Sequence, residues 1–188
     1  MDYWKEVLAA AGANNDSLST EANHIRDVLL KHINENPGIW YRELLRLVNI
    51  SNGSLAHHLR VLEESNRIKV DRKNGLGRTR YYSLNVSDAE SKIIGFIKNS
   101  TTRQIILLML EQEFCTFSEI VDYAKRSPST ISWHIKRLVD RGIVNVRYGE
   151  FTLYTLVNRD FVGDVLAKYK ESLVDKVVNN YVEVIEEL

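Results

Sequence analysis

One short pattern of hydrogen-bonding and cationic side chains occurs twice in this chain, 76 positions apart. The first copy runs from Ser54 to Leu62 and the second from Thr130 to Leu138. In each copy a hydroxyl residue opens the run, a histidine follows, and a basic residue comes two positions after the histidine. Such groups on the outer side of a helix can hydrogen-bond base edges and phosphates in a DNA groove. The repeat therefore predicts two groove-reading helices.

The residues around the first copy predict three helices and a hairpin. A helix capped by Ser19 or Thr20 is stopped by Asn36-Pro37-Gly38, because proline disfavours helix at the preceding residue and glycine tolerates a left-handed turn. Apolar spacing then predicts helices over Tyr41–Val48 and Ser54–Glu64, separated by a tight turn at 49–53. Alternating residues predict strands over Arg67–Arg72 and Thr79–Leu84. This order is typical of a winged helix-turn-helix.

The second copy repeats the same order after a connecting helix over 89–99. A helix opened by Thr101 or Thr102 precedes helices over Phe117–Ala124 and Ser129–Asp140. Strands over Ile143–Arg147 and Phe151–Leu156 follow, joined by a two-residue tip, Gly149-Glu150. That hairpin is three residues shorter than the first and has no cation at its tip.

These patterns predict a mainly α fold with small β-hairpin wings, built from two tandem winged helix-turn-helix domains and a long C-terminal helix. We expect an N-terminal helix and linker, two domains and a terminal helix, over residues 1–18, 19–86, 87–159 and 160–188. The apolar stripe of the last segment fits a helix that pairs with its copy in a homodimer, or one that folds back across both domains.

Charge is segregated along the chain although the formal net charge is zero. Cations dominate 67–80 and 125–147, and acids dominate from Glu171 onward. Since phosphate attraction depends on the local surface, this pattern is compatible with DNA binding. The single cysteine, Cys115, fits a reducing cytoplasm, and neither a signal peptide nor a membrane-spanning apolar run is apparent.

The candidate DNA-binding residues come from the two repeated helices and the first hairpin. They are Asn52, Ser54, His57, His58, Arg60, Lys73, Arg78, Arg80, Ser129, Thr130, Ser132, Trp133, His134, Lys136 and Arg137. Several have a plainer interpretation: the helix and hairpin cations can be solvated, and the two repeated histidines can be packed inside. Trp133 either contacts thymine methyls or sugars, or lies flat on a neighbouring element.

Metal and catalytic sites are not expected. The chain has one cysteine and no His, Cys and carboxylate cluster at ligand spacing, so we predict no metal and no cofactor. Nucleophile-elbow, zinc-protease and phosphate-loop motifs are also absent from the sequence, so an enzyme is not expected.

The quoted motifs resemble a known family. Asn36-Pro37-Gly38, the run from Ser54 to Glu63, and Gly77-Arg78-Thr79-Arg80-Tyr81-Tyr82 look like winged helix-turn-helix transcriptional regulators of the ArsR/MarR type. The tandem arrangement is similar to archaeal regulators, including the euryarchaeal archaellum regulator. The resemblance covers 21–158 and implies sequence-selective binding of promoter DNA, with recognition helices at 54–64 and 130–140 and a wing at 71–80.

Two departures from that family matter. The metal-sensing cysteines of many ArsR proteins are missing, and the usual single domain per subunit is doubled. The alternative function is a winged-helix protein-interaction scaffold, or a subunit of the transcription machinery, that does not read DNA sequence.

Overall fold

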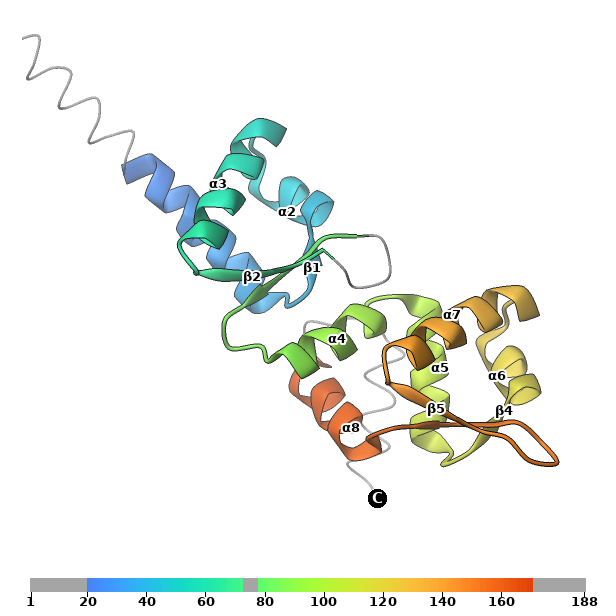
Figure 1. Ribbon diagram of the computed structural model, residues 1–188. Helices are drawn as coiled ribbons and strands as arrows, with labels where there is room; N and C mark the ends of the chain where they lie inside the picture. Colours follow the sequence, from blue (N-terminus) through green and yellow to red (C-terminus); the bar gives the residue numbers. More distant parts are fainter. Residues whose placement is uncertain (1–19, 73–77, 171–188) are drawn as a thin grey trace, which may run out of the picture. The chain divides into compact units, whose positions relative to one another are not determined.

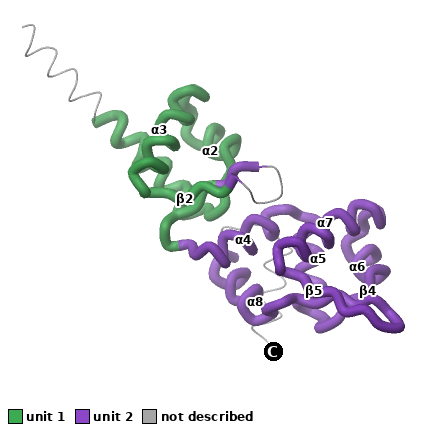
Figure 2. Tube along the Cα trace, viewed as in Figure 1, with its two compact units in different colours: residues 1–71, 81–85 green, residues 72–80, 86–188 purple. Residues whose placement is uncertain are grey.

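The chain divides into two units (Figure 2). The boundary lies between Asn85 and Val86, and residues 72–80 belong to the second unit. The computed structural model in Figure 1 describes residues 20–72 and 78–170. The predicted N-terminal helix and linker therefore lie outside the described residues, as does the C-terminal segment from 171.

The first unit consists of three helices and a three-stranded sheet. Residues 20–35 are helical, and the later elements are β1 (Ile39–Trp40), α2 (Tyr41–Val48), α3 (Asn52–Glu64), β2 (Ile68–Asp71) and β3 (Arg80–Ser83). Gly38 has a φ of 75°, as the turn after the first helix requires, and its N–H donates to the Tyr81 carbonyl at 2.9 Å. This bond brings β1 alongside β3, which lies between β1 and β2.

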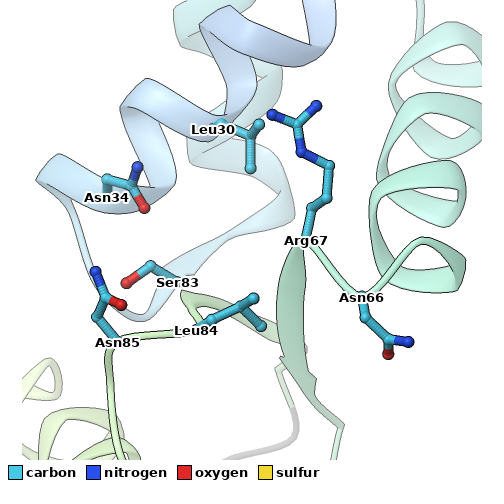
Figure 3. Close-up of a pocket in the computed structure, with 7 residues that line it drawn as sticks. All are labelled: Leu30, Asn34, Asn66, Arg67, Ser83, Leu84 and Asn85. Carbon is cyan, nitrogen blue, oxygen red and sulfur yellow. The ribbon is translucent and has the colours of Figure 1, made fainter.

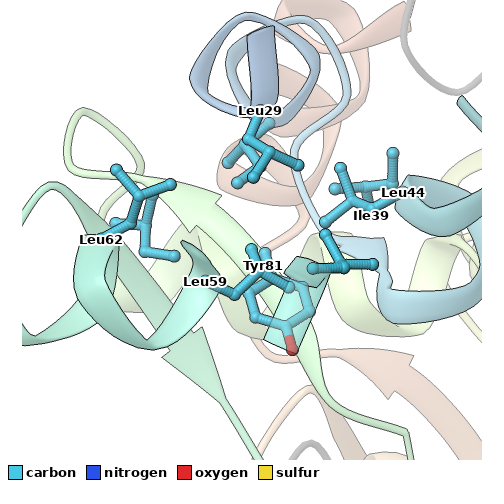
Figure 4. Close-up of a cluster of buried hydrophobic side chains, with 9 residues drawn as sticks. Leu29, Ile39, Leu44, Leu59, Leu62 and Tyr81 are labelled. Carbon is cyan, nitrogen blue, oxygen red and sulfur yellow. The ribbon is translucent and has the colours of Figure 1, made fainter. Parts of the chain in front are cut away.

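The core of the first unit is apolar and draws on every element (Figure 4). Leu29 comes from the first helix, Leu44 from α2, Leu59 and Leu62 from α3, and Tyr81 from β3. Three leucines of α3, at spacings of four and three, thus point inward and leave the other side of the helix in solvent. The core fixes which side chains α3 presents.

The second unit repeats this arrangement and adds a helix at each end. Its elements are α4 (Asp88–Ile97), α5 (Ser100–Glu111), β4 (Cys115–Thr116), α6 (Phe117–Ala124), α7 (Pro128–Asp140), β5 (Val144–Arg147), β6 (Leu153–Leu156) and α8 (Arg159–Lys168). The antiparallel sheet has the order β4-β6-β5. In Figure 1, α8 lies beside α4, and Lys168 of α8 forms an ion pair with Glu90 of α4.

Mostly helical units with small antiparallel sheets confirm the predicted α+β fold class, but three details differ from the sequence predictions. α3 begins at Asn52, because the Ser51 hydroxyl accepts the Ser54 N–H and caps the helix two residues earlier than expected. The second hairpin has a five-residue tip, 148–152, because its last cross-strand pair is Arg147 with Leu153. α8 ends at Lys168, where Tyr169 leaves helical geometry.

Candidate nucleic-acid interface

Helix α3 presents three of the predicted contact residues to solvent. Asn52, His57 and Arg60 are exposed, and Ser54 is half-buried. The Tyr41 hydroxyl lies 2.7 Å from the Asn52 carbonyl oxygen and 2.8 Å from its side-chain oxygen, which fixes this residue in the first turn. Tyr41 therefore holds the hydrogen-bonding groups of Asn52 in place at the start of α3.

Arg60 forms an exposed ion pair on the same helix. Its Nε lies 3.9 Å from a carboxylate oxygen of Glu64, and both side chains are about two-thirds exposed. An exposed pair of this kind contributes little to stability, so the guanidinium can exchange Glu64 for a phosphate at small cost.

Helix α7 begins with a cluster of hydroxyl groups. Ser127 caps the helix, and its Oγ lies 3.1 Å from Ser129 Oγ and 2.8 Å from Thr130 Oγ1. Pro128 occupies the first turn, where its missing N–H costs nothing. The hydroxyls lie at the helix N-terminus, the end that contributes base contacts in helix-turn-helix complexes.

The predicted aromatic and cationic residues of α7 lie together. Trp133 is 51% exposed, and the Arg137 guanidinium carbon lies 4.2 Å from its ring centroid. Burial, followed by the nearby Arg141, lowers the pKa of Arg137 from its ordinary value. Lys136 is exposed and pairs with Asp140 at 3.3 Å. The Trp133 ring thus supports a cation of its own helix and remains half open to solvent.

The two repeated histidines, in contrast, are buried. His58 and His134 are each 6% exposed, which places them with the core leucines instead of with Asn52 or Trp133. Burial is the main cause that lowers the pKa of both, and neighbouring cations add to it: Arg26 at His58 and Arg137 at His134. The structure therefore favours the packed interpretation of these residues over phosphate contact.

The predicted cations of the first hairpin differ in their exposure to solvent. Arg78 is exposed, whereas Arg80 in β3 is 5% exposed, and Lys73 lies outside the described residues. The neighbours of Arg80 in β3, Tyr81 and Tyr82, are buried as well. Arg80 is thus not presented to a partner in this structure.

Two exposed aromatic residues of the second hairpin were missed by the sequence reasoning. Tyr148 is 82% exposed and Phe151 is 67% exposed. They flank the Gly149-Glu150 pair that the sequence analysis treated as the whole tip. Their positions on either side of the predicted tip could have indicated that both side chains are exposed.

A shallow groove on the first unit is lined by seven residues (Figure 3). Its volume is about 300 Å³, and its polar members include Asn34, Ser83 and Asn85, which face one another in the figure. Arg67, at the other end, forms an exposed ion pair with Asp27 at 3.7 Å. None of the candidate DNA-binding residues lines this groove.

Metal-binding clusters and membrane-spanning helices are both absent from the described ranges, 20–72 and 78–170. These ranges contain no group of three or more His, Cys, Asp or Glu side chains able to hold a metal ion. Nor do they contain a helix with the length and apolar character needed to cross a membrane.

Two parts of the chain match known families. Residues 23–94 match a family model described as an N-terminal HTH domain, and residues 99–146 match the model of the bacterial regulatory protein arsR family. The two matches support two tandem helix-turn-helix domains, and the second of them is similar to the arsR family. In each of them the third helix, α3 or α7, is followed by a hairpin wing.

Particular relatives share parts of the chain. It is 30% identical over 122 residues to an uncharacterised HTH-type transcriptional regulator of the archaeon Methanocaldococcus jannaschii. The alignment covers 65% of this chain but only 30% of that relative. Among solved structures, HlyU from Vibrio cholerae is 20% identical with a TM-score of 0.39, covering 46% of this chain and 96% of HlyU. A chain of the endosomal complex ESCRT-II is 14% identical with a TM-score of 0.32, covering 79% and 66% respectively.

Proposed function

We propose that this chain is a cytoplasmic transcription regulator that binds double-stranded promoter DNA sequence-selectively. Helices α3 and α7 enter the major groove, where Asn52, His57 and Arg60 from one and Ser132 and Lys136 from the other meet bases and phosphates. The Arg78 side of the first hairpin contacts the backbone.

One observation carries the proposal: the same helix of each domain turns a polar and cationic side outward. The apolar side of each helix packs into the core of its own domain. Turning the polar side inward would expose three or more buried residues of that helix. The two family matches and the name of the archaeal relative support regulation as the purpose of that surface.

The test is selection of duplexes from a random library at moderate salt, followed by measurement of affinity against a scrambled duplex. A specific binder is expected to prefer the selected sequence by about a thousandfold or more. Failure to enrich any sequence, with weak binding of all duplexes at low salt, would contradict selective binding.

We also propose that the protein is a homodimer held by the C-terminal segment, on the strength of its apolar stripe at Leu173, Val177, Tyr181 and Ile185. Truncation after Lys170 tests this, because Val162 and Leu166 of α8 are buried and must stay. Light scattering should show a dimer for the whole chain and a monomer for the truncated one. A truncated chain that remains dimeric would contradict the assignment.

A second candidate is a winged-helix scaffold that does not read DNA. Zero formal net charge and the exposed aromatics of the second hairpin favour it. The duplex selection separates the two candidates, because a scaffold enriches no sequence.

A further inference from the structure

The second hairpin ends in aromatic side chains, whereas the described residues next to the tip of the first, Arg72 and Arg78, are cations. Tyr148 and Phe151 are the two most exposed large hydrophobic residues in the part of the chain described here, at 82% and 67%. Each can bury roughly 150 Å² or more of surface in a contact. Two such side chains on one tip form an apolar projection of a kind that marks binding surfaces.

The neighbouring residues of the hairpin place Tyr148 on one of its faces. Val144 is buried and Val146 is half-buried, and Val146 lies opposite Tyr154 in the ladder. Tyr148 follows directly after the last ladder pair and lines the same groove as Val146 and Tyr154. Arg147 lies on the other face, with its guanidinium carbon 5.0 Å from the Phe114 ring centroid.

That face adjoins helix α7. Ser132, Lys136 and Asp140 of α7 line one groove of about 260 Å³ together with Val146, Tyr148 and Tyr154 of the hairpin. Burial, and next the nearby Tyr148, raises the pKa of Tyr154, which agrees with the closeness of the two rings. Tyr148 therefore belongs to the same surface as Ser132 and Lys136, two of the proposed DNA contacts.

The charge around this surface selects the partner. With Arg147 turned to the other face, Lys136, Arg137 and Arg141 at α7 stand against Asp140 and Glu150. A partner must offer negative charge to the cations and apolar area to the aromatics. Duplex DNA does both, since phosphates line its edges and sugars and base edges line its minor groove.

We propose that Tyr148 and Phe151 enter the minor groove beside the segment read by α7 and wedge against a base step, bending the duplex there. This inference rests on the proposed function. Apolar side chains inserted in this way open a base step and kink DNA toward the major groove. Since they neutralise no phosphate, they add affinity that salt does not weaken.

The experiment uses the full chain and the duplex selected with the wild-type protein. The Tyr148→Ala/Phe151→Ala double variant should bind about tenfold more weakly, with an unchanged dependence of affinity on salt. End-to-end fluorescence transfer in the labelled duplex should report a smaller bend. Tyr148→Phe keeps the ring and should bind like the wild type. Val157→Ala is the matched control, because Val157 is also apolar and 60% exposed but lies outside the tip.

Three outcomes overturn the inference in distinguishable ways. If the wild type binds and bends the duplex and the double variant does the same, the tip does not touch DNA. If the double variant changes only the mass measured by light scattering, the tip binds a second copy of the chain. If the wild type itself enriches no duplex, the proposed function fails and this inference fails with it.

Discussion

His58 in α3 and His134 in α7 occupy the same position of the two domains, and each is buried against the ring of the residue before it. The His57 and His58 centroids are 5.5 Å apart, and those of Trp133 and His134 are 4.7 Å apart, both edge-to-face. The buried Nδ1 of each has no hydrogen-bond partner within the described residues. His57 and Trp133 thus pack against imidazoles whose burial disfavours the charged form.

Stability should therefore fall in mild acid. Because burial holds both folded pKa values below the ordinary 6.5, the unfolded chain takes up protons first as the pH falls through 6.5. The free energy of unfolding should decrease from there down to the folded pKa values and be insensitive to these groups above 7. Urea unfolding at pH 7.5 and 5.5 measures this, and His58→Leu/His134→Leu should show a smaller loss. His24→Gln, an exposed histidine, is the control, and an equal loss in all three proteins would refute the assignment.

Removing one exposed helix cation should weaken DNA binding through phosphate contact. Arg60→Ala or Lys136→Ala should each reduce the slope of log affinity against log salt by about one. Lys31→Ala is matched to them, since Lys31 also forms an exposed pair four residues along its helix, with Glu35 at 3.9 Å. Titrations of the selected duplex at several salt concentrations give the slopes, and the same slope for Lys31→Ala and Arg60→Ala would count against α3 as a contact helix.

Trp133 should act as a platform for Arg137. Trp133→Ala removes the ring beneath the guanidinium and should cost about 1 kcal/mol of binding free energy, or fivefold in affinity. Trp133→Phe should recover most of it. Fluorescence anisotropy with the selected duplex compares the variants, and equal affinity for Trp133→Ala and the wild type would show that the stacked cation has no part in binding.

The Glu90 carboxylate should stabilise the second domain at neutral pH and not in strong acid. It accepts from Lys168 at 2.6 Å and from the Ser87 N–H at 2.7 Å, and these partners outweigh burial to lower its pKa from 4.5 to about 2. Its contribution is present above pH 4.5 and is lost as the pH falls toward 2.

Thermal unfolding of Glu90→Gln tests this. The variant should melt several degrees below the wild type at pH 7, and the difference should shrink as the pH approaches 2. Glu64→Gln, which alters only an exposed pair, should melt like the wild type at every pH. A constant difference for Glu90→Gln across this range would assign its role to packing.

The helices could be predicted from the sequence because their apolar spacing and caps act locally. α2 and α6 match the predicted ranges to the residue, and each ends at a left-handed residue, Asn49 or Lys125. The predicted α3 lacked its first two residues, Asn52 and Gly53. Asparagine and glycine favour turns, but here the Ser51 cap starts the helix before them.

What depends on the rest of the fold was harder to predict. β1 and β4 are two residues each, too short for alternation to appear, and they exist because β3 and β6 offer them a partner. The sequence left His58 and His134 open between DNA contact and packing, and the folded cores show that they point inward. Tyr148 was missed because its exposure follows from where the β5–β6 ladder stops.

The unequal lengths of the two hairpins have a consequence for how this architecture diverges. Counterparts from β1 to β2 and from β4 to β5 keep one constant spacing, so the difference falls wholly in the tip beyond the paired strands. A duplicated gene can therefore trim or extend that tip without disturbing either interior. The two modules can therefore differ at their hairpin tips while they keep the same arrangement of helices and paired strands.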